Sequence, residues 1–336
     1  MKLRHLLALA VGLGASVPTV AAADTAKRTI RIATVAPKSS SWGKVYAVWQ
    51  KAVEQKTDGK LDLSIYFNGV QGNEDAMVSK IRTGQLDGAA ITAIGLGMIY
   101  KSVLVLQLPG VLTKWDDLDR VRKQLEPDMV EHFKTAGFDV AGWGDVGLVR
   151  QFTKGFEIHR PDDVKDKRPA VWRNEPTGPA LYATIGNIVP VPVDAMEMLP
   201  ALRSGNVNLI AAPALAAEQL QWTPYLDHVN DEVVTCALGA LIFKAGVTES
   251  LPADLKATWD DVQKRVNASQ QGRIRKLDDE AYGRIAQRMT VSHFTQAEHD
   301  EWEKLLRKVV KGLAHGTYEK SLVNKVLTMR GMEPIE

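Results

Sequence analysis

The chain has 336 residues, of which 45% are hydrophobic and 24% are charged, a composition typical of a soluble globular protein with a large core. Its formal net charge of +2 comes from Lys2 and Arg4 in a leader without acidic residues, so 40 basic residues face 40 acidic residues in the remainder. A neutral chain lacks the basic surface of a protein that binds nucleic acid or anionic membranes. The single cysteine, Cys236, excludes an intrachain disulfide and a cysteine-rich metal site.

The first 23 residues have the three parts of a secretory signal peptide. A basic start is followed by an apolar run over residues 6–15 and by small residues that end at Ala23. The apolar run is shorter than the roughly 18–20 residues that a membrane-spanning helix needs. We therefore expect export, cleavage after Ala23 and a periplasmic mature chain that does not insert stably into the membrane.

The first part of the mature chain alternates strands and helices. Strands are predicted over residues 29–35, over 61–67, where apolar and polar residues alternate, and over the short apolar run 88–92. Helical spacing predicts one helix that begins near Trp42, behind the serines 39–41 as caps, and a second over residues 73–83. Strands joined by helices of this length indicate a mostly parallel sheet that is covered on its faces.

A similar order returns about 120 residues later. Strands are predicted at residues 171–172, 188–193 and 209–212, and Asp194 with Glu197 forms a capping-box pattern at a helix start. In both units an arginine stands two residues before the glycine that closes a helix, Gly84 or Gly205. The pattern predicts an α/β fold of two similar lobes, followed by a strand at 233–245 and long helices from 251 to 313.

Catalytic motifs are absent from the sequence. It contains no H-E-x-x-H, no G-x-S-x-G, no P-loop and no dinucleotide-binding glycine motif between a strand and a helix in the mature chain. Cys236 lies in an apolar run and is expected to be a small buried side chain. These observations favour a binding protein without a cofactor or metal over an enzyme.

Several ordered motifs resemble one family. The segments PKSSSW, TDGKL, FNG, GNE and RTGQLD within residues 30–98, and LQLPGVL at 106–112, resemble the DctP-type solute receptors of TRAP transporters. The segment PVDAMEMLPALRSGNVNLIAAP at 192–213 extends the resemblance along the chain. The resemblance implies a periplasmic receptor that closes two hinged lobes on a small molecule and delivers it to membrane permease subunits.

Lobe boundaries follow from the expected hinge crossings. We expect lobe I to contain residues 24–147 and about 233–275. We expect lobe II to contain residues 148–232 and about 276–336, including the C-terminal helices.

Two ligand-binding positions depart from the family pattern. The resemblance implies a carboxylate-binding arginine where this chain has Ala170, and an asparagine where it has Ala212. A family arginine is retained at Arg150, and strand alternation predicts that Arg173 points to the face opposite Ala170 and Trp172. The segment from Val171 to Glu175 and the triplet LQW at 220–222 resemble a branch without the usual arginine.

The candidate ligand-binding residues combine aromatic rings with few polar groups. They are Trp42, Asn68, Glu74, Thr92, Trp143, Arg150, Ala170, Trp172, Arg173, Ala212 and Trp222. A carboxylate buried without a cation is costly. We therefore predict a largely apolar ligand that is lipid-, sterol- or aromatic-like, with Arg150 binding one polar end.

Three alternatives remain open. The chain could be an ordinary organic-acid receptor that uses Arg150, Arg173 or both. It could be an exported enzyme on a two-lobe scaffold, because a fold does not fix a function. It could also deliver its ligand to an envelope protein that is not a permease.

Overall fold

The computed structural model describes residues 27–336, and the side chains of residues 269 and 271 are not described. The predicted signal peptide and its cleavage site lie outside the described residues. Within the described part of the chain, no helix is long and apolar enough to cross a membrane.

The first α/β unit follows the predicted order. It consists of β1 (Arg28–Thr34), α1 (Ser41–Lys56), β2 (Leu61–Tyr66), α2 (Glu74–Thr83) and β3 (Gly88–Thr92). Ser40 caps α1 by accepting a hydrogen bond from the backbone N–H of Gly43. Gly84 ends α2 in the left-handed conformation, with φ of 76°.

The next segment leads out of this unit and into the crossing strands. Its elements are α3 (Ala93–Gly97), the 3-10 helix η1 (Lys101–Gln107), α4 (Trp115–Thr135) and the 16-residue strand β4 (Phe138–Thr153).

The second α/β unit has the predicted lobe pattern with shorter strands. Its elements are η2 (Pro161–Val164), β5 (Ala170–Trp172), α5 (Thr177–Ile185), β6 (Val191–Val193), α6 (Ala195–Arg203), β7 (Leu209–Pro213), α7 (Ala214–Gln219), η3 (Thr223–Tyr225) and β8 (His228–Asn230). Of the strand predicted over residues 188–193, only residues 191–193 form a strand, which is β6. Gly205 has a φ of 72°, close to the 76° of Gly84. Both glycines therefore have the left-handed conformation that the sequence predicts for them.

The C-terminal part contains one strand that the helical pattern concealed. Its elements are β9 (Thr235–Lys244), α8 (Ala253–Ala286), β10 (Thr290–Ser292), α9 (Gln296–Gly316) and α10 (Lys320–Met329). The long helices predicted from 251 to 313 are present as α8 and α9, but the short strand β10 between them was not predicted. This strand pairs in parallel with β8, a long-range contact that helical periodicity does not reveal.

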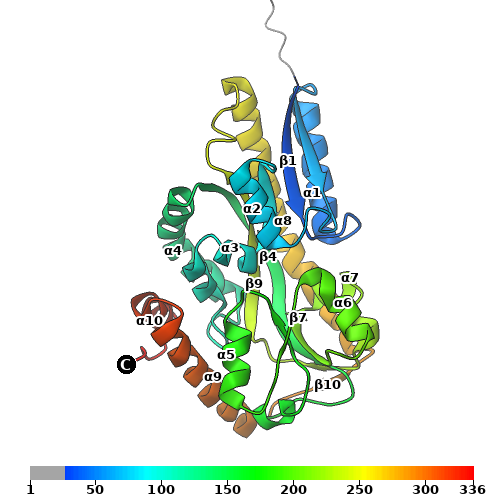
Figure 1. The fold of residues 1–336 in the computed structure, drawn as a ribbon, viewed down its shortest axis with the longest axis vertical. Coiled ribbons are helices and arrows are strands. Elements are labelled where there is room, and N and C mark those ends of the chain that lie inside the picture. The colour runs from blue at the N-terminus through cyan, green and yellow to red at the C-terminus, as the bar shows by residue number, and fades with distance from the viewer. Residues whose placement is uncertain (1–26) are drawn as a thin grey trace, which may run out of the picture.

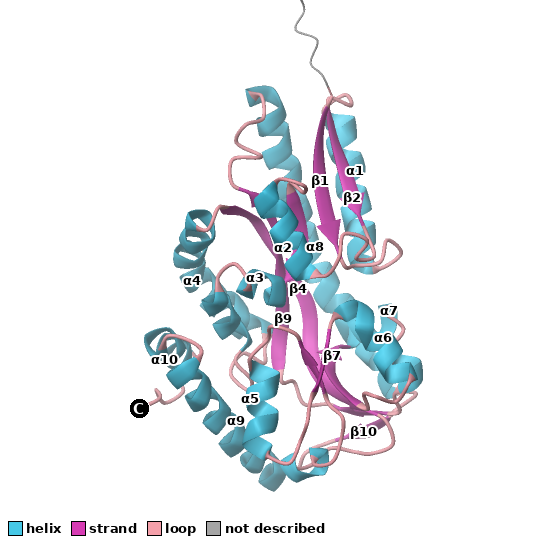
Figure 2. Cartoon of the chain, viewed as in Figure 1, coloured by secondary structure: helices cyan, strands magenta, loops and turns pink. Residues whose placement is uncertain are grey.

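A mixed eight-stranded sheet runs through both lobes in the order β10-β8-β4-β9-β3-β1-β2, and β7 pairs with β4 beside this path. The strands β5 and β6 form a separate parallel pair. The long strands β4 and β9 are antiparallel neighbours that pass from one half of the molecule to the other, and the 34-residue helix α8 runs along them (Figures 1 and 2). These three elements are the crossings between the lobes, as the resemblance implied.

A buried ion network fixes the middle of β4. Asp145, 1% exposed, pairs with Arg122 of α4 at 3.0 Å and with Arg275 of α8 at 2.6 Å. Asp119 pairs with the same two arginines at 2.7 Å each. Two carboxylates and two guanidinium groups therefore join α4, α8 and the crossing strand.

The C-terminal helices contact both halves. Helix α9 packs on α5, whereas α10 packs on η1. The exact lobe boundaries stay a prediction.

Candidate functional site

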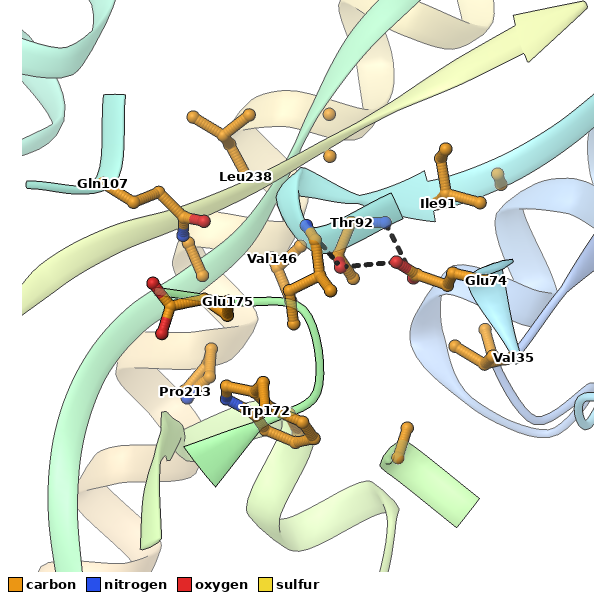
Figure 3. A pocket seen from close by; sticks show the side chains of 18 of the residues that line it. Val35, Glu74, Ile91, Thr92, Gln107, Val146, Trp172, Glu175, Pro213 and Leu238 are labelled. Atoms are coloured by element: carbon orange, nitrogen blue, oxygen red, sulfur yellow. Dashed lines mark hydrogen bonds between the residues drawn. The ribbon is translucent and has the colours of Figure 1, made fainter. Parts of the chain in front are cut away.

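A cavity of about 320 Å³ lies between the two α/β units. Its walls come from both units and from the crossing strands, and Figure 3 labels ten of the residues that line it. Eight of the eleven predicted site residues line it: Trp42, Glu74, Thr92, Trp143, Ala170, Trp172, Arg173 and Trp222. The sequence therefore located the cavity, although contact of these residues with a ligand stays a prediction.

Aromatic side chains form much of the wall. Trp172 and Trp222 pack with ring centroids 6.1 Å apart. Trp42, at the start of α1, is 8% exposed and packs into a hydrophobic cluster that otherwise belongs mainly to the second unit. Trp143 donates its indole N–H to Glu126 Oε1 at 3.1 Å. The cavity wall is therefore rich in aromatic side chains.

Arg150 lies away from the cavity. It is 8% exposed, donates from Nε to the carbonyl of Asp231 at 3.3 Å, and lies 4.0 Å from the ring centroid of Tyr282. Its neighbours in β4, Val149 and Gln151, line the cavity instead. Because successive side chains of a strand point to opposite faces, Arg150 faces α8.

Ala212 and Asn68 are also outside the cavity wall. Ala212 stands directly opposite Arg150 in the β4–β7 pair, so it shares that outer face, and Ala211 and Pro213 line the cavity in its place. Asn68 is exposed in a turn with φ of 58°. Because successive side chains of a strand point to opposite faces, a shift of one residue along β7 separates Ala212 from the residues that line the cavity.

Arg173 lines the cavity, contrary to the strand-alternation prediction. Strand β5 ends at Trp172, so the alternation does not extend to the next residue. Its Nε donates to Asp194 at 3.1 Å and its Nη2 to Glu197 at 2.5 Å. Arg173 is the one Lys, Arg or His among the described residues that line the cavity.

Asp194 also connects the two units. Its Oδ2 accepts a hydrogen bond from Asn73 Nδ2 at 2.7 Å, and both residues line the cavity. Glu197 reaches back to the backbone N–H of Asp194 at 3.0 Å, as the capping pattern predicted. The sequence signalled Asp194 as a helix start, but nothing in the sequence signalled its partner across the cleft.

A second contact joins the units at α1 and α7. Gln219 accepts from the backbone N–H of Ser41 at 2.8 Å and donates to Ser41 Oγ at 2.7 Å. Together with the Asn73–Asp194 bond, it joins the two units.

Glu74 is held by the start of α3. Its Oε1 accepts from the N–H of Thr92 and its Oε2 from Thr92 Oγ1, both at 2.8 Å (Figure 3). Its Oε2 also accepts from the N–H of Gly95 at 2.8 Å. A Cβ at Gly95 would lie 2.8 Å from Glu74 Oε2, so glycine leaves room for the carboxylate. Burial raises the pKa of Glu74, and its hydrogen bonds from Thr92 and Gly95 oppose that rise.

Other lining residues were not singled out by the sequence. The inner wall contains Tyr46, Trp49, Gln107, Gln263, Asn267 and Gln270. Burial raises the pKa of Tyr46 to about 12, so this hydroxyl stays protonated near neutral pH. The indole nitrogens of Trp42 and Trp49 and the Thr235 hydroxyl have no hydrogen-bond partner among the described residues.

The cavity shows no constellation for metal binding or nucleophilic catalysis. The described residues contain no group of three or more His, Cys, Asp or Glu that could hold a metal ion. Cys236 is buried as predicted, and burial raises the pKa of its thiol to about 12. The arrangement is suited to holding a small molecule between two units.

Comparisons with known proteins agree with this geometry. A family model described as bacterial extracellular solute-binding protein, family 7 (DctP) matches residues 32–316. A solute-binding protein from Chromohalobacter salexigens is 26% identical over 58% of this chain, and the match spans 57% of the relative's length. Another from Verminephrobacter eiseniae is 24% identical over 83% of this chain and 82% of its own length.

Solved structures share the fold. A sugar-acid-binding protein from Advenella mimigardefordensis in complex with galactonate has a TM-score of 0.83 at 17% identity, covering 91% of this chain and 98% of its own. A TRAP periplasmic solute-binding protein from Sulfurospirillum deleyianum with bound succinate has a TM-score of 0.83 at 16% identity, covering 90% and 99%. The chain belongs to the DctP family of bacterial extracellular solute-binding proteins, and is therefore a binding protein of the two-lobe α/β fold rather than an enzyme.

Proposed function

We propose that this receptor captures an organic acid with a largely apolar body and delivers it to the membrane permease subunits of a TRAP transporter. The observation that carries the proposal is the position of Arg173. It is the single cationic side chain among the described residues that line the cavity, and a guanidinium group is suited to binding a carboxylate.

The acid group of the proposed ligand follows the alternative prediction, an organic-acid receptor, rather than the main prediction of a largely apolar ligand. The similar structures from Advenella and Sulfurospirillum contain galactonate and succinate, which favours an acid over a ligand without charge. Arg173, not Arg150, is the available anchor, because Arg150 is turned toward Tyr282. The indole N–H groups of Trp42 and Trp49 are further unpaired donors in the wall.

The apolar body of the proposed ligand follows the main prediction, a largely apolar ligand. Ala170 stands where the resemblance implies an arginine, and it is 9% exposed beside the pair of Trp172 and Trp222. A second ligand carboxylate at this end would be buried without a cation, which is costly. We therefore expect simple dicarboxylates to bind weakly.

Calorimetry with matched compounds tests the proposal. We expect 3-phenylpropanoate to bind at least tenfold more tightly than 3-phenylpropan-1-ol, which has the same body without the charge, and more tightly than succinate. Arg173→Gln should remove the preference for the acid. Arg203→Gln is the matched control, because Arg203 is in the same unit and binds Tyr225 outside the cavity wall.

Equal affinity for the acid and the alcohol would contradict the acid anchor. Tight binding of succinate would contradict the apolar body. Delivery to a permease is tested separately, by deletion of the gene and measurement of the uptake of the labelled acid into cells.

A further inference from the structure

The charges around Arg173 do not balance. Asp194 and Glu197 both pair with this arginine, and Glu74 lies at the same end of the cavity, next in sequence to the Asn73 that binds Asp194. Of these three carboxylates, Asp194 and Glu197 contact the guanidinium group, and no ion pair joins Glu74 to it among the described residues. A simple acid that binds to Arg173 adds a fourth negative charge to this end.

Glu74 is the carboxylate without a cation. All three of its hydrogen-bond donors, from Thr92 and Gly95, are neutral, and no described Lys, Arg or His forms an ion pair with it. Burial raises the pKa of Glu74, and the nearby carboxylate of Asp194 adds to the rise. A carboxylate buried without a cation is costly, and a nearby positive charge reverses that cost.

Glu74 also retains capacity to accept. A carboxylate offers about four acceptor sites, and Oε1 accepts a single hydrogen bond, from the N–H of Thr92. The residue lines the cavity, and the backbone and hydroxyl donors that bind it fix its orientation. A ligand N–H group can therefore be received by a carboxylate that does not have to move.

We propose that the ligand carries an ammonium group beside its carboxylate, and that Glu74 binds the ammonium group while Arg173 binds the carboxylate. The proposal rests on the acid anchor proposed above and names the second charged group of the same ligand. An amino acid with an aromatic or branched apolar side chain has this chemistry. Its body lies against the tryptophan walls, and its two head charges leave the net charge of the cavity end unchanged.

Three compounds with one body separate the two proposals. Phenylalanine, as both enantiomers, has both charges; 3-phenylpropanoate lacks the ammonium group; 2-phenylethylamine lacks the carboxylate. Norleucine, hexanoate and pentylamine form the same series on a linear body. The ammonium group should raise affinity at least tenfold, measured as phenylalanine against 3-phenylpropanoate or as norleucine against hexanoate.

Two variants locate the effect. Glu74→Gln should reduce the gain from the ammonium group to less than twofold, and it should not weaken the binding of 3-phenylpropanoate, because it removes a negative charge from this end of the cavity. Glu175→Gln is the matched control, because Glu175 is also a cavity-lining carboxylate and accepts from the N–H groups of Thr177 and Gly178 at the start of α5. It should keep the gain.

Proton release provides a measurement on the unmodified protein. Because burial raises the pKa of Glu74, ammonium binding should displace protons from its carboxyl at acidic pH, seen by calorimetry in two buffers of different ionisation enthalpy, whereas 3-phenylpropanoate should displace fewer. The charged or titratable groups at this end besides Glu74 are Asp75, Asp194, Glu197, Arg173 and Tyr46.

Each outcome decides between the proposals. Binding of 2-phenylethylamine without binding of 3-phenylpropanoate contradicts the acid anchor and supports the ammonium site. Binding of the acids without a gain from the ammonium group overturns the ammonium site alone, as does a gain that survives Glu74→Gln or is lost in Glu175→Gln. Binding by none of the six compounds contradicts both proposals.

Discussion

Asn73 and Asp194 join the two α/β units across the cavity through a hydrogen bond of 2.7 Å from Asn73 Nδ2 to Asp194 Oδ2. The same oxygen accepts from Arg173, the proposed acid anchor. Ligand binding at Arg173 and closure of the units therefore share one carboxylate. A second contact, between Ser41 and Gln219, acts on the α1 side.

Removing these contacts should weaken ligand binding, because it destabilises the closed arrangement of the two units. A net hydrogen bond is worth about 0.5–1.5 kcal/mol, so Asn73→Ala should lower affinity by roughly two- to tenfold. The double variant with Gln219→Ala should lower it further and raise the radius of gyration in small-angle X-ray scattering. Ser204→Ala is the control, because its hydroxyl bonds within one unit to Ala201. Unchanged affinity in the double variant would show that the contacts do not stabilise closure.

Most of the fold could be predicted because its elements carry local signals. The strand at residues 88–92 was predicted at its observed bounds, and Ser40 and Gly84 cap their helices as their residue types indicate. Strand β10 was missed because it has three residues and exists through its pairing with β8. A segment that depends on a distant partner has little periodicity of its own.

The site was predictable as a region but not by side-chain direction. Motif positions placed Trp172 and Glu74 at the cavity, yet they could not show that Arg150 and Ala212 share the outer face of the β4–β7 pair. Strand alternation also misplaced Arg173, because β5 ends one residue earlier. Contacts between units, such as that of Asn73 with Asp194, arise from packing and leave no local signal.

Restoring an arginine at position 170 should change the ligand preference. Ala170 lines the cavity and is 9% exposed. Ala170→Arg should raise the affinity for succinate at least tenfold, because a bidentate guanidinium pair supplies the missing countercharge. It should weaken 3-phenylpropan-1-ol by a similar factor, because the longer side chain fills apolar space. Calorimetry measures both, with thermal unfolding as the folding control. Weaker binding of both ligands in a folded variant would place position 170 outside the carboxylate site.

Neutralising Asp145 should destabilise the crossing between the lobes. Its side chain is fully buried between Arg122 and Arg275, and removing one partner of a buried ion pair costs about 3–5 kcal/mol. Asp145→Asn should lower the free energy of unfolding in urea by about this amount, reduced by the contacts of both arginines with Asp119. Asp128→Asn, at an exposed residue paired with Lys325, should change it by less than about 1 kcal/mol. An equal loss in both variants would contradict the structural role of the network.

Stability should depend on pH through Glu74. Burial raises the pKa of Glu74 above its ordinary value, with Asp194 adding to the rise. The folded state therefore binds the proton more tightly than the unfolded chain, whose glutamate pKa is about 4.3. This contribution to stability is fully present below pH of about 4.3 and is lost as pH rises through the pKa in the folded state.

Urea unfolding between pH 4 and pH 8 measures this contribution. Compared with the unmodified chain, Glu74→Gln should show a smaller loss of unfolding free energy across this range, because glutamine does not titrate. Glu298→Gln is the control, because Glu298 caps α9 on the surface and the pKa of its carboxyl is lowered by hydrogen bonds from Thr295. Its profile should differ in the opposite direction, with less stability lost at the acidic end. Parallel profiles for the unmodified chain and Glu74→Gln would show that the carboxyl of Glu74 titrates alike in the folded and unfolded states.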